Sequence, residues 1–210
     1  MSKDASLFLE ISDIFFKNYD VITMDFRGHG RSSGLFTFTA KEPQDLHAVV
    51  KFAKNIYPKI GIVGFSLGAA TSIVYAAEHK DVQSMIAVSG PTDFSKVENH
   101  FLKKEAVIPA IKKFEFGKGP SLRPGNIFLK KTRPLDVVEE ISPIPILFIT
   151  GSSDPIVHPW HVDELYKRAK QPKAIENFDQ GLHAEDLYLK MNSRFITVCK
   201  EWFNKTIDIA

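Results

Sequence analysis

The stretch Lys-Ile-Gly-Ile-Val-Gly-Phe-Ser-Leu-Gly-Ala-Ala at residues 59–70 joins a short apolar run to a glycine-containing turn. Its first seven residues, 59–65, are rich in β-branched and apolar side chains, which is typical of a buried strand. The residues from 67 to 79 predict a helix. Between strand and helix, residues 64–68 fit the pattern G-x-S-x-G, which places a serine on a sharp strand-to-helix turn.

Ser66 is the serine of that turn, and its position predicts a nucleophile. Glycines on either side let the backbone turn tightly enough to expose the hydroxyl above the sheet. The following helix directs amides and the positive end of its dipole at developing negative charge, so the backbone N–H of Leu67 is the expected oxyanion donor. A turn of this kind also needs small residues for packing alone, which is the alternative explanation of the pattern.

A serine hydroxyl needs a base to take its proton and a carboxylate to orient that base. Asp154 follows the predicted strand at 145–150, and His183 follows the predicted strand at 173–178. Both therefore lie at the carboxyl edge of the predicted sheet, where ligands meet open α/β sheets. The order Ser66, Asp154, His183 predicts a catalytic triad of nucleophile, acid and base.

Other histidines and acids compete for these roles. Histidines within helices or in residues 91–143 are interpreted as surface or core side chains: His47, His79 and His100. His158 and His161 lack a third ligand at a suitable spacing, so we expect no metal. His29 lies in the loop RGHGRSSG at 27–34 and is either a pocket residue or a turn residue. Helix capping and solvation explain the acids nearest His183, which are Asp179, Glu185 and Asp186.

Outward from the motif, apolar strands and amphipathic helices alternate along the chain. The predicted helices are 4–18, 42–57, 67–79, 159–170 and about 186–205, and the predicted strands are 21–26, 59–65, 84–89, 145–150 and 173–178. This alternation predicts one α/β domain over residues 1–210, with a mostly parallel sheet flanked by helices.

Residues 91–143 interrupt the alternation and contain several prolines, which predicts a small helical lid insertion. We expect an apolar pocket beneath it, with substrate contacts from His29, Phe94, Phe101, Phe114 and Trp160. Packing of the lid against the sheet explains the aromatic residues equally well.

Composition and charge limit the classes of partner and cofactor that we expect. The chain of 210 residues carries a net charge of +2, which gives no reason to expect nucleic acid. Acids interrupt the apolar pattern of the first twenty residues, so we expect neither a signal peptide nor a membrane span. The expected location is therefore the cytoplasm. The single cysteine, Cys199, excludes an internal disulfide and a multi-cysteine metal site. Triad chemistry needs no cofactor, and none is expected.

Four motifs together resemble the α/β-hydrolase superfamily: DFRGHGRSSG at 25–34, GIVGFSLGAA at 61–70, PILFITGSSDPIV at 145–157 and GLHAED at 181–186. The short lid and the last motif are similar to small intracellular acyl-ester or cinnamoyl-ester esterases and to dienelactone-hydrolase-like relatives. The resemblance implies that Ser66 forms an acyl-enzyme, that His183 shuttles protons and that Asp154 orients His183.

The chain departs from that family at its beginning. Family members carry further strands and a His-Gly loop that supplies another oxyanion N–H, whereas this sequence starts at MSKDAS, so the predicted fold is N-terminally shortened. The family's third strand lies beside the nucleophile strand. We therefore expect that residues 21–26 pair with 59–65, or that a second copy pairs with this edge in a homodimer. A truncated sequence is the third explanation.

The sequence thus predicts a serine hydrolase that cleaves a small-molecule carboxylic ester through an acyl-enzyme. Peptidase, thioesterase, acyltransferase and perhydrolase activity remain open, because fold and triad do not fix the chemistry. The alternative is a catalytically weak or inactive hydrolase-fold binding protein, because the first oxyanion-hole loop is missing.

Overall fold

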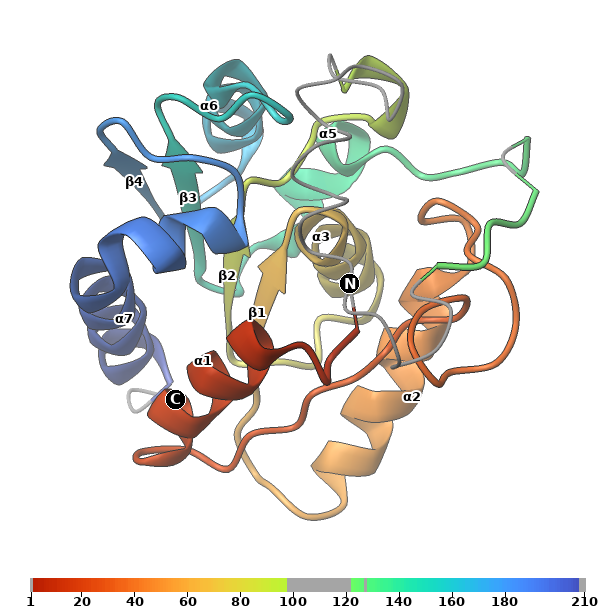
Figure 1. Cartoon of the computed structure of the whole chain (residues 1–210), viewed down its shortest axis with the longest axis horizontal. Helices are drawn as coiled ribbons and strands as arrows, with labels where there is room; N and C mark the ends of the chain where they lie inside the picture. The colour runs from red at the N-terminus through yellow and green to blue at the C-terminus, as the bar shows by residue number, and fades with distance from the viewer. Residues whose placement is uncertain (1, 98–121, 127, 208–210) are drawn as a thin grey trace.

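A four-stranded parallel sheet forms the centre of the protein (Figure 1). The computed structural model describes residues 2–97, 122–126 and 128–207. The strands follow the sequence in their spatial order, β1-β2-β3-β4, and pair in parallel throughout. Their bounds are β1 Gly61–Phe65, β2 Ser84–Val88, β3 Ile146–Gly151 and β4 Lys173–Phe178. The predicted parallel sheet is confirmed at these four strands.

Helices occupy the connections between the strands and the segments before β1 and after β4. They are α1 Ser6–Phe16, α2 Glu42–Lys54, α3 Leu67–His79, α5 Pro134–Val137, α6 Pro159–Arg168 and α7 Glu185–Thr206. Two short 3-10 helices, η1 Phe94–Lys96 and η2 Val138–Ile141, lie between β2 and β3. Every strand-to-strand connection thus contains helix, as a parallel sheet requires.

Two apolar layers cover the faces of the sheet. In β2 and β3, Met85 and Phe148 face one cluster, which contains buried residues of α2, α3 and α6. Ile86 and Leu147, each one residue along, face the other cluster, which is built mainly from α1 and α7 (Figure 1). Successive side chains of a strand point to opposite faces, so strands buried on both sides have apolar residues at every position.

Residues 21–26 do not form the predicted strand. They run without secondary structure on the far side of a cavity whose other wall is β1. β1 is therefore an edge strand among the described residues, and the expectation that 21–26 pairs with it is wrong. An apolar β-branched run favours an extended backbone, but a ladder also needs a neighbour about 4.8 Å away. The homodimer through this edge stays a prediction, which light scattering of the purified chain would test.

The predicted lid at 91–143 is described only in part. Short isolated bridges join His29 to Leu122 and Phe36 to Pro124, so this segment contacts the loop after residues 21–26. Phe101 and Phe114 lie outside the described residues. In the described part of the chain, no helix combines the length and apolarity needed to cross a membrane.

Candidate active site

Ser66 lies on a strained turn between β1 and α3. Its φ of 51° and ψ of −109° are unfavourable for a residue with a side chain, and such conformations concentrate at functional sites. A Cβ on Gly64 would lie 2.6 Å from the carbonyl carbon and oxygen of Gly68, so the first motif glycine is required for close approach. A Cβ on Gly68 itself would meet open space. The Ser66 N–H donates to the Val88 carbonyl of β2 at 2.8 Å, which fixes the turn to the sheet.

The three side chains of the predicted triad lie in contact. His183 Nε2 is 3.0 Å from Ser66 Oγ, and His183 Nδ1 is 2.8 Å from Asp154 Oδ2 and 3.0 Å from Oδ1. Asp154 and His183 are 3% and 6% exposed, so water does not compete for the hydrogen bonds between these two side chains. Asp154 and His183 lie 88 and 117 residues after Ser66 in the chain, so the fold brings the three side chains together.

Asp154 is held as an oriented acceptor. Its Oδ1 accepts the backbone N–H groups of Ile156 and Val157, both at 2.9 Å, which leaves Oδ2 directed at His183. This arrangement favours the imidazole tautomer with the proton on Nδ1, so that Nε2 can accept the proton of Ser66.

The loops that carry Asp154 and His183 approach closely at two glycines. A Cβ on Gly151 would collide with the backbone of Gly181, and Ser153 N–H donates to the Gly181 carbonyl at 2.9 Å. Sequence reasoning missed both glycines as site residues. The signal that could have found them is their position, one at the end of a strand and the other two residues before the predicted base.

A cavity of about 1080 Å³ opens at the triad and runs along β1. Ser66, Leu67 and His183 line one end, and Phe203 and Ile207 line it where β1 begins. Further apolar lining side chains come from α1, α2 and residues 21–26. Leu67 is the first residue of α3, so its N–H has no acceptor within the helix and is available as an oxyanion donor.

The predicted substrate contacts separate into three groups. His29 and Phe94 line this cavity. Burial lowers the pKa of His29 below its usual value, and its ring packs edge-on against Phe36 with centroids 4.9 Å apart. Trp160 lies elsewhere, stacked on His161 at 3.7 Å, and is not part of the cavity lining. Phe101 and Phe114 belong to the segment without description.

The competing candidates have other contacts. Asp179 accepts from Ser152 Oγ at 3.3 Å, and His161 Nδ1 contacts Thr92 Oγ1 at 2.8 Å. No group of three or more potential metal ligands occurs among the described side chains.

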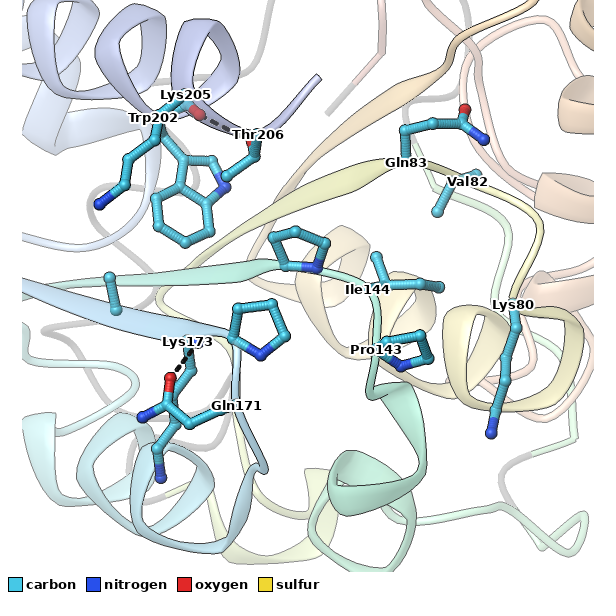
Figure 2. Close-up of a pocket in the computed structure, with 13 residues that line it drawn as sticks. Lys80, Val82, Gln83, Pro143, Ile144, Gln171, Lys173, Trp202, Lys205 and Thr206 are labelled. Atoms are coloured by element: carbon cyan, nitrogen blue, oxygen red, sulfur yellow. Dashed lines mark hydrogen bonds between the residues drawn. The ribbon is translucent and has the colours of Figure 1, made fainter. Parts of the chain in front are cut away.

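A second cavity of about 650 Å³ lies where the strands begin, at the opposite edge of the sheet (Figure 2). Trp202 and three prolines form its apolar wall, and three lysines lie around it. No triad residue lines this cavity, so the candidate active site is the larger one.

Known proteins resemble the chain over most of its length. A family model described as the alpha/beta hydrolase fold matches residues 5–114. The uncharacterized protein YqkD of Bacillus subtilis is 27% identical over 98% of this chain and 67% of its own length. The alpha/beta hydrolase domain-containing protein WAV2 of Arabidopsis thaliana is 26% identical over 84% and 60%, respectively. The chain spans 55–67% of the length of the first curated relatives.

Solved structures give the same picture. The esterase Pf2001 of Pyrococcus furiosus superposes with a TM-score of 0.76 at 25% identity, covering 98% of this chain and 79% of that one. The alpha/beta hydrolase GrgF of Penicillium superposes with a TM-score of 0.83 at 19% identity, covering 99% and 87%, which shows the fold alone.

Proposed function

Because the chain belongs to the alpha/beta hydrolase fold family, we propose that it is a serine hydrolase that cleaves a carboxylic ester. The observation that carries the proposal is the continuous contact from Asp154 through His183 to Ser66, at 2.8 and 3.0 Å. A buried carboxylate, an imidazole and a strained serine in this order have the roles of a nucleophilic catalyst. The similarity to an esterase of known structure supports an ester as substrate.

In the proposed reaction, His183 Nε2 removes the proton of Ser66 Oγ as this oxygen attacks the ester carbonyl. Asp154 stabilises the imidazolium, and the Leu67 N–H donates to the oxyanion of the tetrahedral intermediate. His183 then returns the proton to the departing alkoxide, leaving Ser66 acylated. Water, activated by the same imidazole, attacks the acyl-enzyme and restores Ser66.

The cavity supports an ester whose acyl group is apolar. Its lining includes Phe65, Phe94 and Ile156, and the buried ring of His29 also lines it. Since burial lowers the pKa of His29, its ring is neutral near pH 7 and adds no charge to the pocket. A small-molecule ester with an apolar acyl group is therefore the proposed substrate.

One observation favours a second candidate, a hydrolase-fold binding protein with weak or absent catalysis. Ser2, Lys3 and Ala5 line the cavity, but two of their amides already have acceptors. Lys3 N–H donates to Asp25 at 2.6 Å, and Ala5 N–H donates to the Ser2 carbonyl at 3.1 Å. These amides cannot assist Leu67 without rearrangement, and one missing oxyanion donor costs about 100- to 1000-fold in rate.

Labelling with a fluorophosphonate probe, followed by intact mass spectrometry, tests the two candidates. Ser66→Ala removes the proposed nucleophile, and Ser95→Ala removes another serine that lines the same cavity. The hydrolase predicts one adduct on the wild type and on Ser95→Ala, and none on Ser66→Ala. A folded wild type that stays unlabelled would contradict the hydrolase and favour the binding protein. Hydrolysis of p-nitrophenyl esters of increasing acyl length would then define the substrate.

A further inference from the structure

Ser89 connects the end of β2 to the turn that carries His183. It follows the last residue of β2, is fully buried and does not line the cavity. Its Oγ accepts the backbone N–H of Ala184 at 3.0 Å. Ala184 comes directly after His183, so this hydrogen bond ties the backbone beside the proposed base to the central sheet.

Ser89 also belongs to a group of strained residues around the triad. Ser66, Ser89 and Ala184 have φ values of 51°, 49° and 45°, a region that residues with side chains rarely adopt. Such conformations persist where the surroundings over-determine them. Here hydrogen bonds do so: Ser66 N–H donates to the Val88 carbonyl and Ser89 N–H to the Ile149 carbonyl, both at 2.8 Å.

The turn at the proposed nucleophile and the turn after the proposed base are therefore both hydrogen-bonded to the same short stretch, residues 88 and 89. The Val88 carbonyl fixes the Ser66 turn, and the next residue, Ser89, fixes the turn after His183. If the Ser89 hydroxyl is removed, the buried Ala184 N–H loses this acceptor, and the turn must move for the amide to find another. A shift of the turn would lengthen the 3.0 Å contact between His183 Nε2 and Ser66 Oγ.

We propose that Ser89 is a positioning residue that sets the distance between His183 and Ser66. This inference rests on the proposed function, because it concerns the efficiency of the same triad. Ser89 touches no substrate and acts through the backbone of Ala184 alone. Its loss should therefore slow the reaction of Ser66 with little effect on the binding of an ester.

The test compares Ser89→Ala and Ser89→Gly with Thr150→Val. Thr150 is fully buried in β3, and its Oγ1 has no partner among the described residues, so Thr150→Val removes a buried hydroxyl without removing a hydrogen bond. Ser89→Gly also removes the hydroxyl, and glycine tolerates the φ of 49° at this position. This variant can therefore be used if Ser89→Ala does not fold. Fluorophosphonate labelling rates and the kcat and KM for a p-nitrophenyl ester are measured, with melting temperatures as the folding control.

We expect kcat and the labelling rate to fall about 100-fold in both Ser89 variants, the order of loss that a 1 Å misplacement causes, with KM nearly unchanged. Thr150→Val should keep the wild-type rate. In the background of His183→Ala, removing the Ser89 hydroxyl should cause no further loss, because residues that act as a unit are not additive. A general loss of folding would instead lower the measured rates in both the wild-type and the His183→Ala background.

Two outcomes would overturn the inference while leaving the hydrolase intact. The first is a folded Ser89→Gly that is labelled at the wild-type rate, and the second is an equal loss in Thr150→Val. A wild type that is not labelled at Ser66 is a different result, since it contradicts the proposed function itself and the role of Ser89 with it.

Discussion

Substitutions of Asp154 distinguish its contribution to the stability of the fold from its contribution to the proposed catalysis. In Asp154→Asn, Oδ1 can still accept the N–H groups of Ile156 and Val157, while an amide NH2 replaces Oδ2 opposite His183. Oδ1, 3.0 Å from Nδ1, already accepts two backbone N–H groups, and the NH2 at the shorter contact cannot accept from Nδ1. We therefore expect the imidazole to carry its proton on Nε2, where it cannot take the proton of Ser66. In a comparable triad this change costs about 10⁴-fold in kcat, or about 5.5 kcal/mol in the barrier.

Asp154→Ala is the matched variant, because it also removes the acceptor of the two backbone amides. Each orphaned amide costs about 1–3 kcal/mol, so the free energy of unfolding should fall by about 2–6 kcal/mol. Ester hydrolysis and guanidinium unfolding are measured on both variants. We expect Asp154→Asn to lose activity and keep most of its stability, and Asp154→Ala to lose both. Equal stability losses, or an Asp154→Asn activity within tenfold of the wild type, would refute this reasoning.

Three further predictions concern stability and reactivity. Gly64→Ala places a Cβ 2.6 Å from the Gly68 carbonyl, so the free energy of unfolding should fall by about 1–3 kcal/mol in denaturant titrations. An unchanged midpoint would contradict the close approach. Burial and a hydrogen bond to Glu10 raise the pKa of Tyr188 from 10 to about 12; the neutral ring therefore stabilises the fold fully below pH 10, and this contribution is lost as the pH rises from 10 to 12. Unfolding measured across that range should show the loss in the wild type and a smaller one in Tyr188→Phe. Burial also raises the pKa of Cys199, so its thiol should react with Ellman's reagent only after unfolding, and rapid native reaction would show that it is accessible.

The contact among Ser66, Asp154 and His183 could be predicted because each of the three residues follows a strand of the sheet. Three strands of one parallel sheet have their carboxyl ends at the same edge, whatever the details of packing. Here these strands are residues 61–65, 146–151 and 173–178. Chain order and strand ends therefore sufficed to choose Asp154 and His183 from several acids and histidines. The contact distances follow from the loops, which the sequence does not determine.

The strand at 21–26 could not be decided in the same way. Its residues favour an extended backbone, but in the structure they have no secondary structure. Pairing depends on which segment lies alongside, and that is a property of tertiary structure. Ser89 was missed for a related reason, since a serine at the end of a strand has no pattern that reveals a partner 95 residues away.

Among the described residues, one edge of β1 has no neighbouring strand, and this affects the time scale of motion in the strand that leads to Ser66. Backbone amides of a parallel strand point alternately to its two edges, so every second N–H of residues 61–65 bonds to β2 and the others point at the cavity. Amides bonded to β2 should exchange with deuterium only when the sheet opens, whereas their neighbours need no such opening. Protection along β1 should therefore alternate with a period of two residues. By this measure a single strand is part of the stable core along one edge and part of a fluctuating surface along the other.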